Sequence, residues 1–274
     1  MQQLYREYKR TGVIHVQKRA GRHKQPITES VKNEIIELYR KYRLNASYIG
    51  RILRIKGIHI RNERINEVLK EAGFAMSEPR TWHRKKWIRY EREHSNSLWH
   101  VDWHEIKDPR WKGLWLIVYE DDSSRFIVGY GLYPTLTSKY SVDVLKEAIE
   151  KYGRPEQILS DHGTTFYAVE TDQKKKGFTE FEKFLMKEKI AFIVGRVDHP
   201  QTNGKVEKFF DIFEKKVKFF DSIDEFMNWY NFIRPHGAFD IERLETPAMI
   251  YYKRLPRKEI IDPSFFKLLD KGVE

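Results

Sequence analysis

The chain of 274 residues contains no cysteine and no long run of apolar side chains. Without cysteine there is no disulfide and no thiolate zinc finger, so any metal must be held by oxygen or imidazole ligands. No apolar stretch approaches the roughly 18 to 20 residues that span a bilayer, and the first residues lack a signal-peptide pattern. We therefore expect a soluble, intracellular protein with no membrane partner.

What the sequence has in abundance is aromatic and basic residues. It contains 7 Trp, 15 Tyr and 17 Phe, which is ample for a packed core. Its net charge of +11 is uneven, because residues 1–95 hold 23 Lys and Arg against 10 Asp and Glu, whereas the remainder holds 28 against 30. This division predicts a polyanion-binding module ahead of a catalytic or structural module; the alternative is a solubilising surface bias.

The basic part contains a segment, residues 26–76, with helical periodicity throughout. Apolar residues recur at spacings of three and four, first from Val31 to Tyr39, then around Ile49 and Leu53, and again after a turn at Gly57. The pattern predicts a small all-α helix-turn-helix domain. Its third helix, over residues 61–72, would direct Arg61 and Arg64 into a major groove of DNA. Any three-helix bundle would show the same periodicity.

Two basic segments flank these helices. Residues 1–25 combine a short helix with a basic linker, and we interpret them as the remnant of a first helix-turn-helix. Residues 77–97 intersperse Trp82 and Trp87 with cations that include Lys85 and Lys86, a composition that suits an arm following the DNA backbone. An interdomain helix with a solvated face explains this second segment equally well.

From residue 98 to residue 220 the pattern becomes that of an α/β domain. Alternating or apolar runs predict strands, and longer amphipathic segments predict helices. The order is mixed, and it predicts a five-stranded sheet with flanking helices whose parallel strands deliver residues to their C-terminal edge. Residues 221–274 are expected to form a helical tail. The predicted strands are 98–106, 114–119, 126–132, 157–160 and 190–195, and the predicted helices are 138–152, 178–188, 203–220 and 223–232.

Three acids stand at places where such a fold brings side chains together. Asp102 alternates with Val101 and Trp103 on the first strand, Asp161 follows the fourth strand, and Glu207 lies in a helix that begins after an Asn-Gly turn. Converging carboxylates need counter-charge, and Mg²⁺ or Mn²⁺ prefers such oxygen ligands. Two such ions would activate a nucleophile and stabilise the leaving oxygen of an in-line phosphoryl displacement.

Each of these residues also has an ordinary explanation. A single acid is usually solvated, Asp198 and Asp211 are alternatives to Glu207, and Asp121 and Asp122 are expected to cap a hairpin turn. Histidines near the acids are candidates for the site or simple hydrogen-bonding residues. They are His100, His104, His162 and His199.

Four motifs in order give the chain a resemblance to a known family. They are Trp99–Glu105, Ser160–Phe166 (SDHGTTF), His199–Glu207 (HPQTNGKVE), and a tail that comprises residues 229–238 and Thr246-Pro247-Ala248. Together they resemble the catalytic core of the DDE superfamily, shared by retroviral integrases and insertion-sequence transposases. Within that group the chain is most similar to transposases with an N-terminal helix-turn-helix.

The resemblance implies an RNase H-like fold and a DNA transposase. Asp102, Asp161 and Glu207 would be its catalytic metal ligands, and its substrates would be double-stranded transposon ends and target DNA. It also implies a homodimer or higher homo-oligomer, cytoplasmic and associated with the nucleoid. Residues expected near the DNA are His162, Asn203 and Lys205, although Asn203 also suits a helix cap and Lys205 a solvated surface.

One departure from the family pattern is visible. Asp161 and Glu207 are separated by 45 residues, more than the family usually has, and we assign the excess to the polar segment Ala168–Gly177, either a flap that touches DNA or a solvated loop. Two other functions stay open. The alternatives to an active transposase are a catalytically silent DNA-binding protein, such as a domesticated or truncated transposase, and an RNase H-like nuclease without strand transfer.

Overall fold

The computed structural model describes residues 2–13, 26–74, 91–161, 163–167, 177–195 and 204–256. None of the helices in these segments combines the length and apolar character needed to cross a membrane. The α-helices are α1 (Gln2–Thr11), α2 (Glu29–Tyr42), α3 (Ala46–Ile55), α4 (Asn62–Glu71), α5 (Ser138–Tyr152), α6 (Glu180–Lys187), α7 (Gly204–Lys216), α8 (Ile223–Asn228) and α9 (Pro247–Lys253). The strands are β1 (Trp99–Glu105), β2 (Trp115–Asp121), β3 (Ile127–Tyr133), β4 (Gln157–Ser160) and β5 (Ala191–Val194). Short 3-10 turns lie at Pro109–Trp111, Val217–Phe219 and Ile241–Arg243, and a π-helix at Trp229–Ile233.

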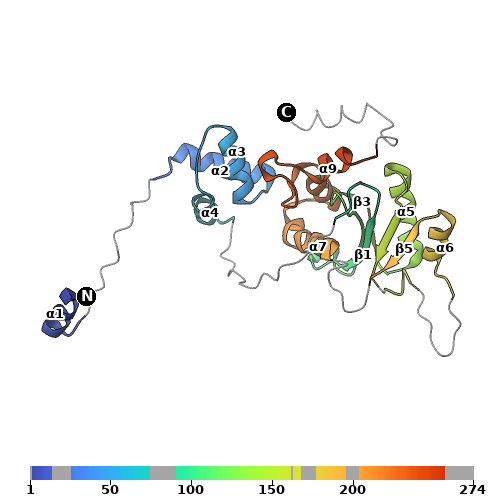
Figure 1. Ribbon diagram of the computed structural model, residues 1–274, viewed down its shortest axis with the longest axis horizontal. Helices are drawn as coiled ribbons and strands as arrows, with labels where there is room; N and C mark the ends of the chain where they lie inside the picture. The colour runs from blue at the N-terminus through green and yellow to red at the C-terminus, as the bar shows by residue number, and fades with distance from the viewer. Residues whose placement is uncertain are drawn as a thin grey trace.

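The five strands form one mixed sheet in the order β3-β2-β1-β4-β5 (Figure 1). The first three strands are antiparallel neighbours, whereas β4 lies parallel to both β1 and β5. The crossovers into the parallel half run through helices, as parallel pairing requires. This arrangement confirms the predicted α/β fold of the RNase H-like type.

Alternation along β1 divides its side chains between two cores. Trp99, Val101 and Trp103 are buried with residues of α5, α6 and α9 on one face of the sheet. The opposite face packs against α7 and α8, whose Phe209 and Phe226 are fully buried. Helices from beyond residue 220 therefore complete both cores, because α8 covers one face and α9 the other.

The segment before the sheet folds into a three-helix bundle, α2 to α4. Its core is apolar, with Ile35, Ile49 and Ile65 fully buried. Asn45 caps α3, since its side chain accepts hydrogen bonds from two backbone N–H groups of the first turn. The predicted helices are therefore present. Whether they act as a helix-turn-helix stays a prediction.

The bundle packs against the C-terminal part of the sheet domain. The indole of Trp229 donates a hydrogen bond of 2.7 Å to the carbonyl of Tyr42 at the end of α2. Arg51 of α3 pairs with Glu242 at 2.9 Å, and its Nε also donates to the Glu242 carbonyl at 2.7 Å. These contacts join segments about 190 residues apart in the chain.

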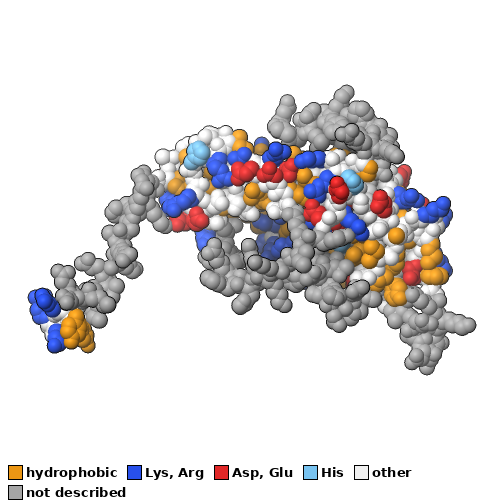
Figure 2. Space-filling view, in the orientation of Figure 1, with side chains coloured by type: hydrophobic (Ala, Val, Ile, Leu, Met, Phe, Trp, Pro, Cys, Tyr) orange, Lys and Arg blue, Asp and Glu red, His pale blue; other side chains and the backbone are white. Residues whose placement is uncertain are grey.

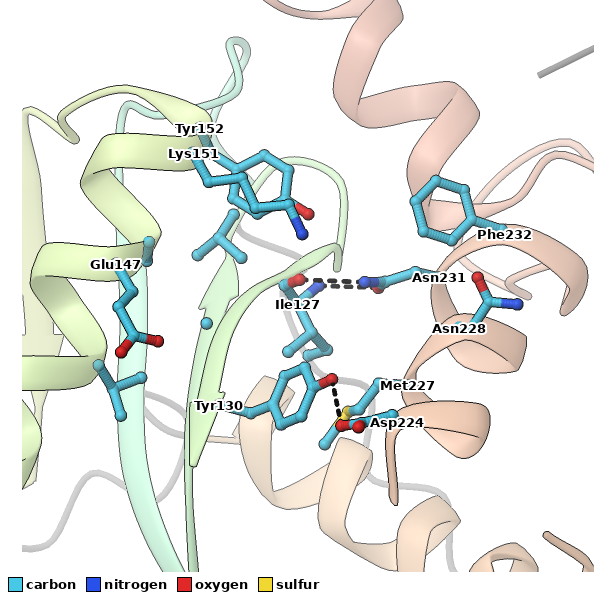
Figure 3. Close-up of a pocket in the computed structure, with 14 residues that line it drawn as sticks. Ile127, Tyr130, Glu147, Lys151, Tyr152, Asp224, Met227, Asn228, Asn231 and Phe232 are labelled. Atoms are coloured by element: carbon cyan, nitrogen blue, oxygen red, sulfur yellow. Dashed lines mark hydrogen bonds between the residues drawn. The ribbon is translucent and has the colours of Figure 1, made fainter. Parts of the chain in front are cut away.

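Two predicted helices end differently in the structure. The helix expected over 203–220 begins at Gly204 and changes to a 3-10 turn after Lys216, and the one expected over 223–232 widens into a π-helix at Trp229. In that π-helix Asn231 meets edge strand β3: its side chain accepts from the N–H of Ile127 at 2.9 Å and donates to its carbonyl at 3.0 Å (Figure 3). Asn231 thus bonds to an edge of the sheet beside which the described residues place no further strand.

Candidate active site

Asp102 projects from the middle of β1 toward α7. It is the register partner of Val118, which belongs to the core beneath α7, and directly paired residues share a face of the sheet. The carboxylate is half-buried and accepts a hydrogen bond of 2.8 Å from the backbone N–H of Trp103. The face predicted from alternation is therefore the face observed.

Asp161 follows β4 immediately and lies beside Asp102. The parallel register pairs Trp99 with Ile158 and His100 with Leu159, and the same offset continued for two residues places Asp161 level with Asp102. The exposed Asp161 carboxylate accepts a hydrogen bond of 2.8 Å from the N–H of Gly163. A Cβ at Gly163 would approach Asp161 Oδ1 to 2.9 Å, so a larger residue there would displace the carboxylate from its position over the backbone N–H.

Glu207 lies in the first turn of α7, next to the buried Val206. This helix follows β1 closely. Near its start Lys205 contacts Asp122, which also contacts His100. Further along, Phe210 stacks on His104 with ring centroids 4.6 Å apart. Since Glu207 falls between the two α7 contacts and Asp102 between the two histidines, the packing sets these acids opposite one another.

The electrostatics agree with this convergence. The pKa of Asp102 is raised to about 7, chiefly by burial and also by the charges of Asp161 and Glu207, against the opposing hydrogen bond from the N–H of Trp103. In the described parts of the chain, no three His, Asp or Glu side chains are gathered tightly enough to hold a metal ion as they stand. The donor set nevertheless fits a hard divalent cation, because it consists of carboxylates that repel one another.

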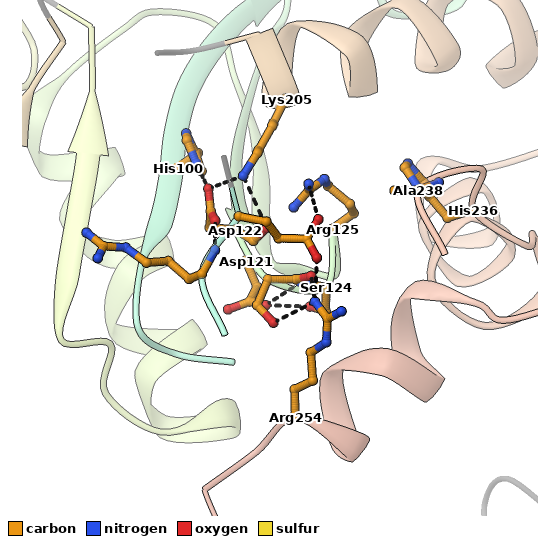
Figure 4. A network of polar contacts seen from close by, with 12 residues as sticks. His100, Asp121, Asp122, Ser124, Arg125, Lys205, His236, Ala238 and Arg254 are labelled. Carbon is orange, nitrogen blue, oxygen red and sulfur yellow. Dashed lines mark hydrogen bonds and ion pairs between the residues drawn. The ribbon is translucent and has the colours of Figure 1, made fainter. Parts of the chain in front are cut away.

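A buried polar network fixes the start of α7 against the sheet (Figure 4). At its centre Asp122 accepts hydrogen bonds from His100 at 2.6 Å, from the ammonium of Lys205 and from the backbone N–H of Arg92 at 2.7 Å. Burial favours the neutral acid, but the partners His100 and Lys205 outweigh it and lower the pKa of Asp122. An ionised Asp122 therefore links the strand of Asp102 to the helix of Glu207.

The neighbouring acids play different parts. Asp121 caps the β2–β3 turn as predicted, accepting from the N–H and hydroxyl of Ser124. Asp122 does not cap that turn, which corrects the prediction, because its side chain is occupied by the network. Glu120 is fully buried, neither of its carboxylate oxygens has a hydrogen-bond partner in the described segments, and burial raises its pKa to about 8.

The other predicted site residues divide into four groups. His100 and His104 are hydrogen-bonding histidines, the latter 2.7 Å from Glu214. Lys205 is directed at Asp122 rather than being a solvated lysine, and its DNA contact stays a prediction. Arg61 is exposed at the start of α4, while Arg64 pairs with Glu67 on its own helix. His162, His199, Asn203, Lys85, Lys86, Asp198 and residues 168–176 lie outside the described residues.

Asp211 and two cavities are alternatives for the site. Asp211 is exposed and pairs with Lys208 of its own helix at 3.3 Å, and, unlike Glu207, it is not among the charges that raise the pKa of Asp102. A cavity of about 430 Å³ lies between β3, α5 and α8 (Figure 3), and one of about 990 Å³ separates α2 from the segment after the π-helix. Neither cavity contains any of the three acids.

Sequence reasoning missed Asp122. The sequence contains both partners of its ion pair, since Asp122 follows the second predicted strand and Lys205 comes two residues before Glu207. A contact between positions 83 residues apart is, however, invisible without the fold.

Two solved structures are similar to this chain in fold. The catalytic core domain of HTLV-2 integrase in complex with magnesium is 19% identical, with a TM-score of 0.44, over 57% of this chain and 96% of that chain. A chain of the simian T-cell lymphotropic virus intasome in complex with PP2A regulatory subunit B56 gamma is 17% identical, with a TM-score of 0.48, over 84% of this chain and 76% of that chain.

Two sequence relatives are more similar in identity. An Archaeoglobus fulgidus protein described as uncharacterized is 30% identical over 109 residues, which are 40% of this chain and 85% of that protein. The "Putative integrase ORF3" of Spiroplasma virus SpV1-C74 is 27% identical over 139 residues, which are 44% of this chain. The chain spans only 38% of the length of that viral protein.

The RNase H-like fold and a match to a family model support a polynucleotidyl transferase-like class of protein. Residues 92–200 match the family model described as integrase core domain, a range that includes Asp102 and Asp161 and ends before Glu207. The chain belongs to the integrase core domain family, as a DDE integrase or transposase catalytic core.

Proposed function

We propose that the protein is a metal-dependent DNA transposase that cleaves and joins double-stranded DNA ends by in-line phosphoryl transfer. The observation that carries the proposal is the convergence of Asp102, Asp161 and Glu207 from β1, the end of β4 and α7 in an integrase core. The DNA would comprise transposon ends and a target, and action on two ends favours a homodimer or larger homo-oligomer.

The three carboxylates would hold Mg²⁺ or Mn²⁺, two ions in all. Such ions supply charge stabilisation at the transferring phosphoryl group and lower the pKa of a bound nucleophile. The protein contributes position. Gly163 keeps the Asp161 carboxylate folded back, and the Asp122 network fixes the helix of Glu207. Neutralising one acid should therefore remove activity without disturbing the fold, because Asp161 and Glu207 are exposed.

The test uses the purified protein, Mg²⁺, and DNA from the flanks of its gene, including a pre-cleaved end for the joining step. We expect Asp161→Asn and Glu207→Gln each to reduce cleavage and joining at least about 1,000-fold, since several kcal/mol of charge stabilisation is lost. The matched control is Asp211→Asn, an exposed acid one turn after Glu207 on α7, which should keep full activity. Cleavage or joining by Asp161→Asn would refute the assignment.

A catalytically silent DNA-binding protein is the second candidate. It is favoured by the absence, among the described residues, of three acids or histidines already gathered for a metal. Binding of DNA by the wild-type protein without any cleavage or joining in Mg²⁺ or Mn²⁺ would support it. Cleavage without joining of a pre-cleaved end would instead identify a nuclease.

A further inference from the structure

A cluster of cations lies where the helix bundle meets the end of α7. We define the seam cluster as Arg43, Lys216, Lys218 and Arg234. Arg43 follows α2, the two lysines lie at the end of α7 and in the turn after it, and Arg234 follows the π-helix. In the space-filling view, Lys and Arg side chains lie between the bundle and the sheet domain together with Asp and Glu side chains (Figure 2).

Two shared aromatic rings lie beside three of these cations. The Arg43 guanidinium lies 5.3 Å and the Lys216 ammonium 5.5 Å from the centroid of the Phe219 ring, and Lys218 lies 5.3 Å from the same ring. Arg43 and Lys216 also lie over Tyr39 of the bundle, at 5.8 and 5.9 Å. Interleaved cations and aromatic faces are typical of nucleic-acid-binding surfaces.

The seam cluster lacks neutralising acids. None of its four cations forms a salt bridge with a carboxylate in the described parts of the chain, whereas Arg51, Arg125 and Lys205 each do. Burial and then the charges of Arg234, Lys218 and Arg43 lower the pKa of Lys216. One guanidinium nitrogen of Arg234 is buried without a hydrogen-bond partner among the described residues. The cluster is therefore short of an anion.

Helix dipoles alone do not explain this density of charge. Cations near helix C-termini are stabilised by the dipole, and both α2 and α7 end here with basic residues. A dipole does not, however, favour four mutually repelling cations from three separate segments. Arg43 also has a φ of 53°, in the left-handed region that favours glycine. A strained position is thus occupied by the side chain that reaches both rings.

We infer that the seam cluster binds the phosphate backbone of double-stranded DNA that extends along α7 from the three carboxylates. The inference rests on the proposed function for its ligand, because α7 carries Glu207 in its first turn and Lys216 at its last residue. Nine residues of helix separate them by about 13 Å. That length corresponds to about four nucleotides of one strand. Nine residues are two and a half turns, so the two side chains leave opposite sides of α7, and a duplex held at the acids would reach the cluster around the end of the helix.

The test measures binding of a labelled duplex of arbitrary sequence by fluorescence anisotropy, in EDTA so that no chemistry occurs. Removing two phosphate contacts in Lys216→Gln/Lys218→Gln should weaken binding roughly 10-fold at low salt and reduce the slope of log affinity against log salt by about 2. The matched control is Lys146→Gln/Lys151→Gln on α5, across the sheet, whose ammoniums also lie over aromatic rings. It should bind as the wild type does.

One further variant keeps the result unambiguous. Lys216→Arg retains the charge and should bind as the wild type does, which separates loss of charge from loss of folding. Because binding is measured in EDTA, where neither cleavage nor joining occurs, a failure of the proposed catalysis leaves the binding result intact. An unchanged salt slope in the seam variant, equal losses in the α5 control, or an effect limited to single-stranded DNA would overturn the inference.

Discussion

The two ends of α7 treat positive charge in opposite ways. At the N-terminal end Lys205 is largely buried and paired with Asp122. The Asp122 carboxylate also accepts hydrogen bonds from His100 and from a backbone N–H. At the C-terminal end Lys216 lies among Arg43 and Arg234 with no carboxylate partner in the described residues. A charge satisfied inside the protein fixes geometry, whereas a charge left unsatisfied is available to an external anion.

This difference matches the distance of each end from the candidate acids. Lys205 is two residues from Glu207, and a metal site requires that its carboxylates be held in place. Lys216 is more than two turns away, where an adaptable electrostatic contact is sufficient. The comparison therefore predicts that substitutions at the first end alter stability and those at the second alter DNA affinity.

The largest effect is expected at Asp122, the shared partner at the first end. Asp122→Ala leaves the buried Lys205 ammonium and the His100 ring without their acceptor, and removing one partner of a buried pair costs about 3 to 5 kcal/mol. Urea unfolding followed by tryptophan fluorescence measures the change. Asp211→Ala, which removes an exposed acid from the same helix, should cost less than about 0.5 kcal/mol. Equal effects of the two substitutions would show that the network does not stabilise the fold.

A matched pair of lysines on α7 tests the comparison directly. Lys205→Met removes a hydrogen bond to a buried charge and should cost about 1 to 3 kcal/mol. Lys216→Met removes no hydrogen bond within the described segments and relieves repulsion, so we expect a change within about 0.5 kcal/mol. Affinity for duplex DNA in EDTA should show the reverse order, with the larger loss in Lys216→Met. If Lys216→Met destabilised the protein as much as Lys205→Met, the two ends would not differ as described.

Much of the fold was predictable because its signals are local. Alternation in β1 predicted the face of Asp102, and the apolar runs before Asp161 and around residues 115–133 predicted the strands that the structure contains. The helix that bears Glu207 followed from the Asn-Gly turn and the amphipathic pattern after it. These features depend on neighbours within a few residues, which spacing along the chain reveals.

What the sequence did not reveal depends on tertiary packing. Asp122 lies in a turn, where acids ordinarily cap, and its three partners come from other segments. The π-helix carries Asn231, whose hydrogen-bond partner lies on an edge strand 104 residues earlier. The seam cluster joins helix ends that look like ordinary dipole caps until the bundle packs on α7. In each case local chemistry favoured a simpler interpretation.

The smallest expected effect on stability concerns Glu120 of β2, a buried acid near the N-terminal end of α7 that has no hydrogen-bond partner in the described segments. Its pKa is raised from an ordinary acid value to about 8 by burial, so the folded state binds a proton that the unfolded state has released. Where the folded state binds more protons, stability falls as pH rises, by up to about 1.4 kcal/mol per pH unit for one proton.

Between pH 6 and 7.5 we therefore expect Glu120 to lower the free energy of unfolding by about 1 to 2 kcal/mol. Glu120→Gln should remove that decline, while Asp102 and Asp121 titrate alike in both proteins, so the difference between the two pH profiles of urea unfolding isolates Glu120. Parallel profiles would mean that Glu120 is already ionised in the folded protein, and that the network at the start of α7 tolerates an unpaired charge as the seam cluster does.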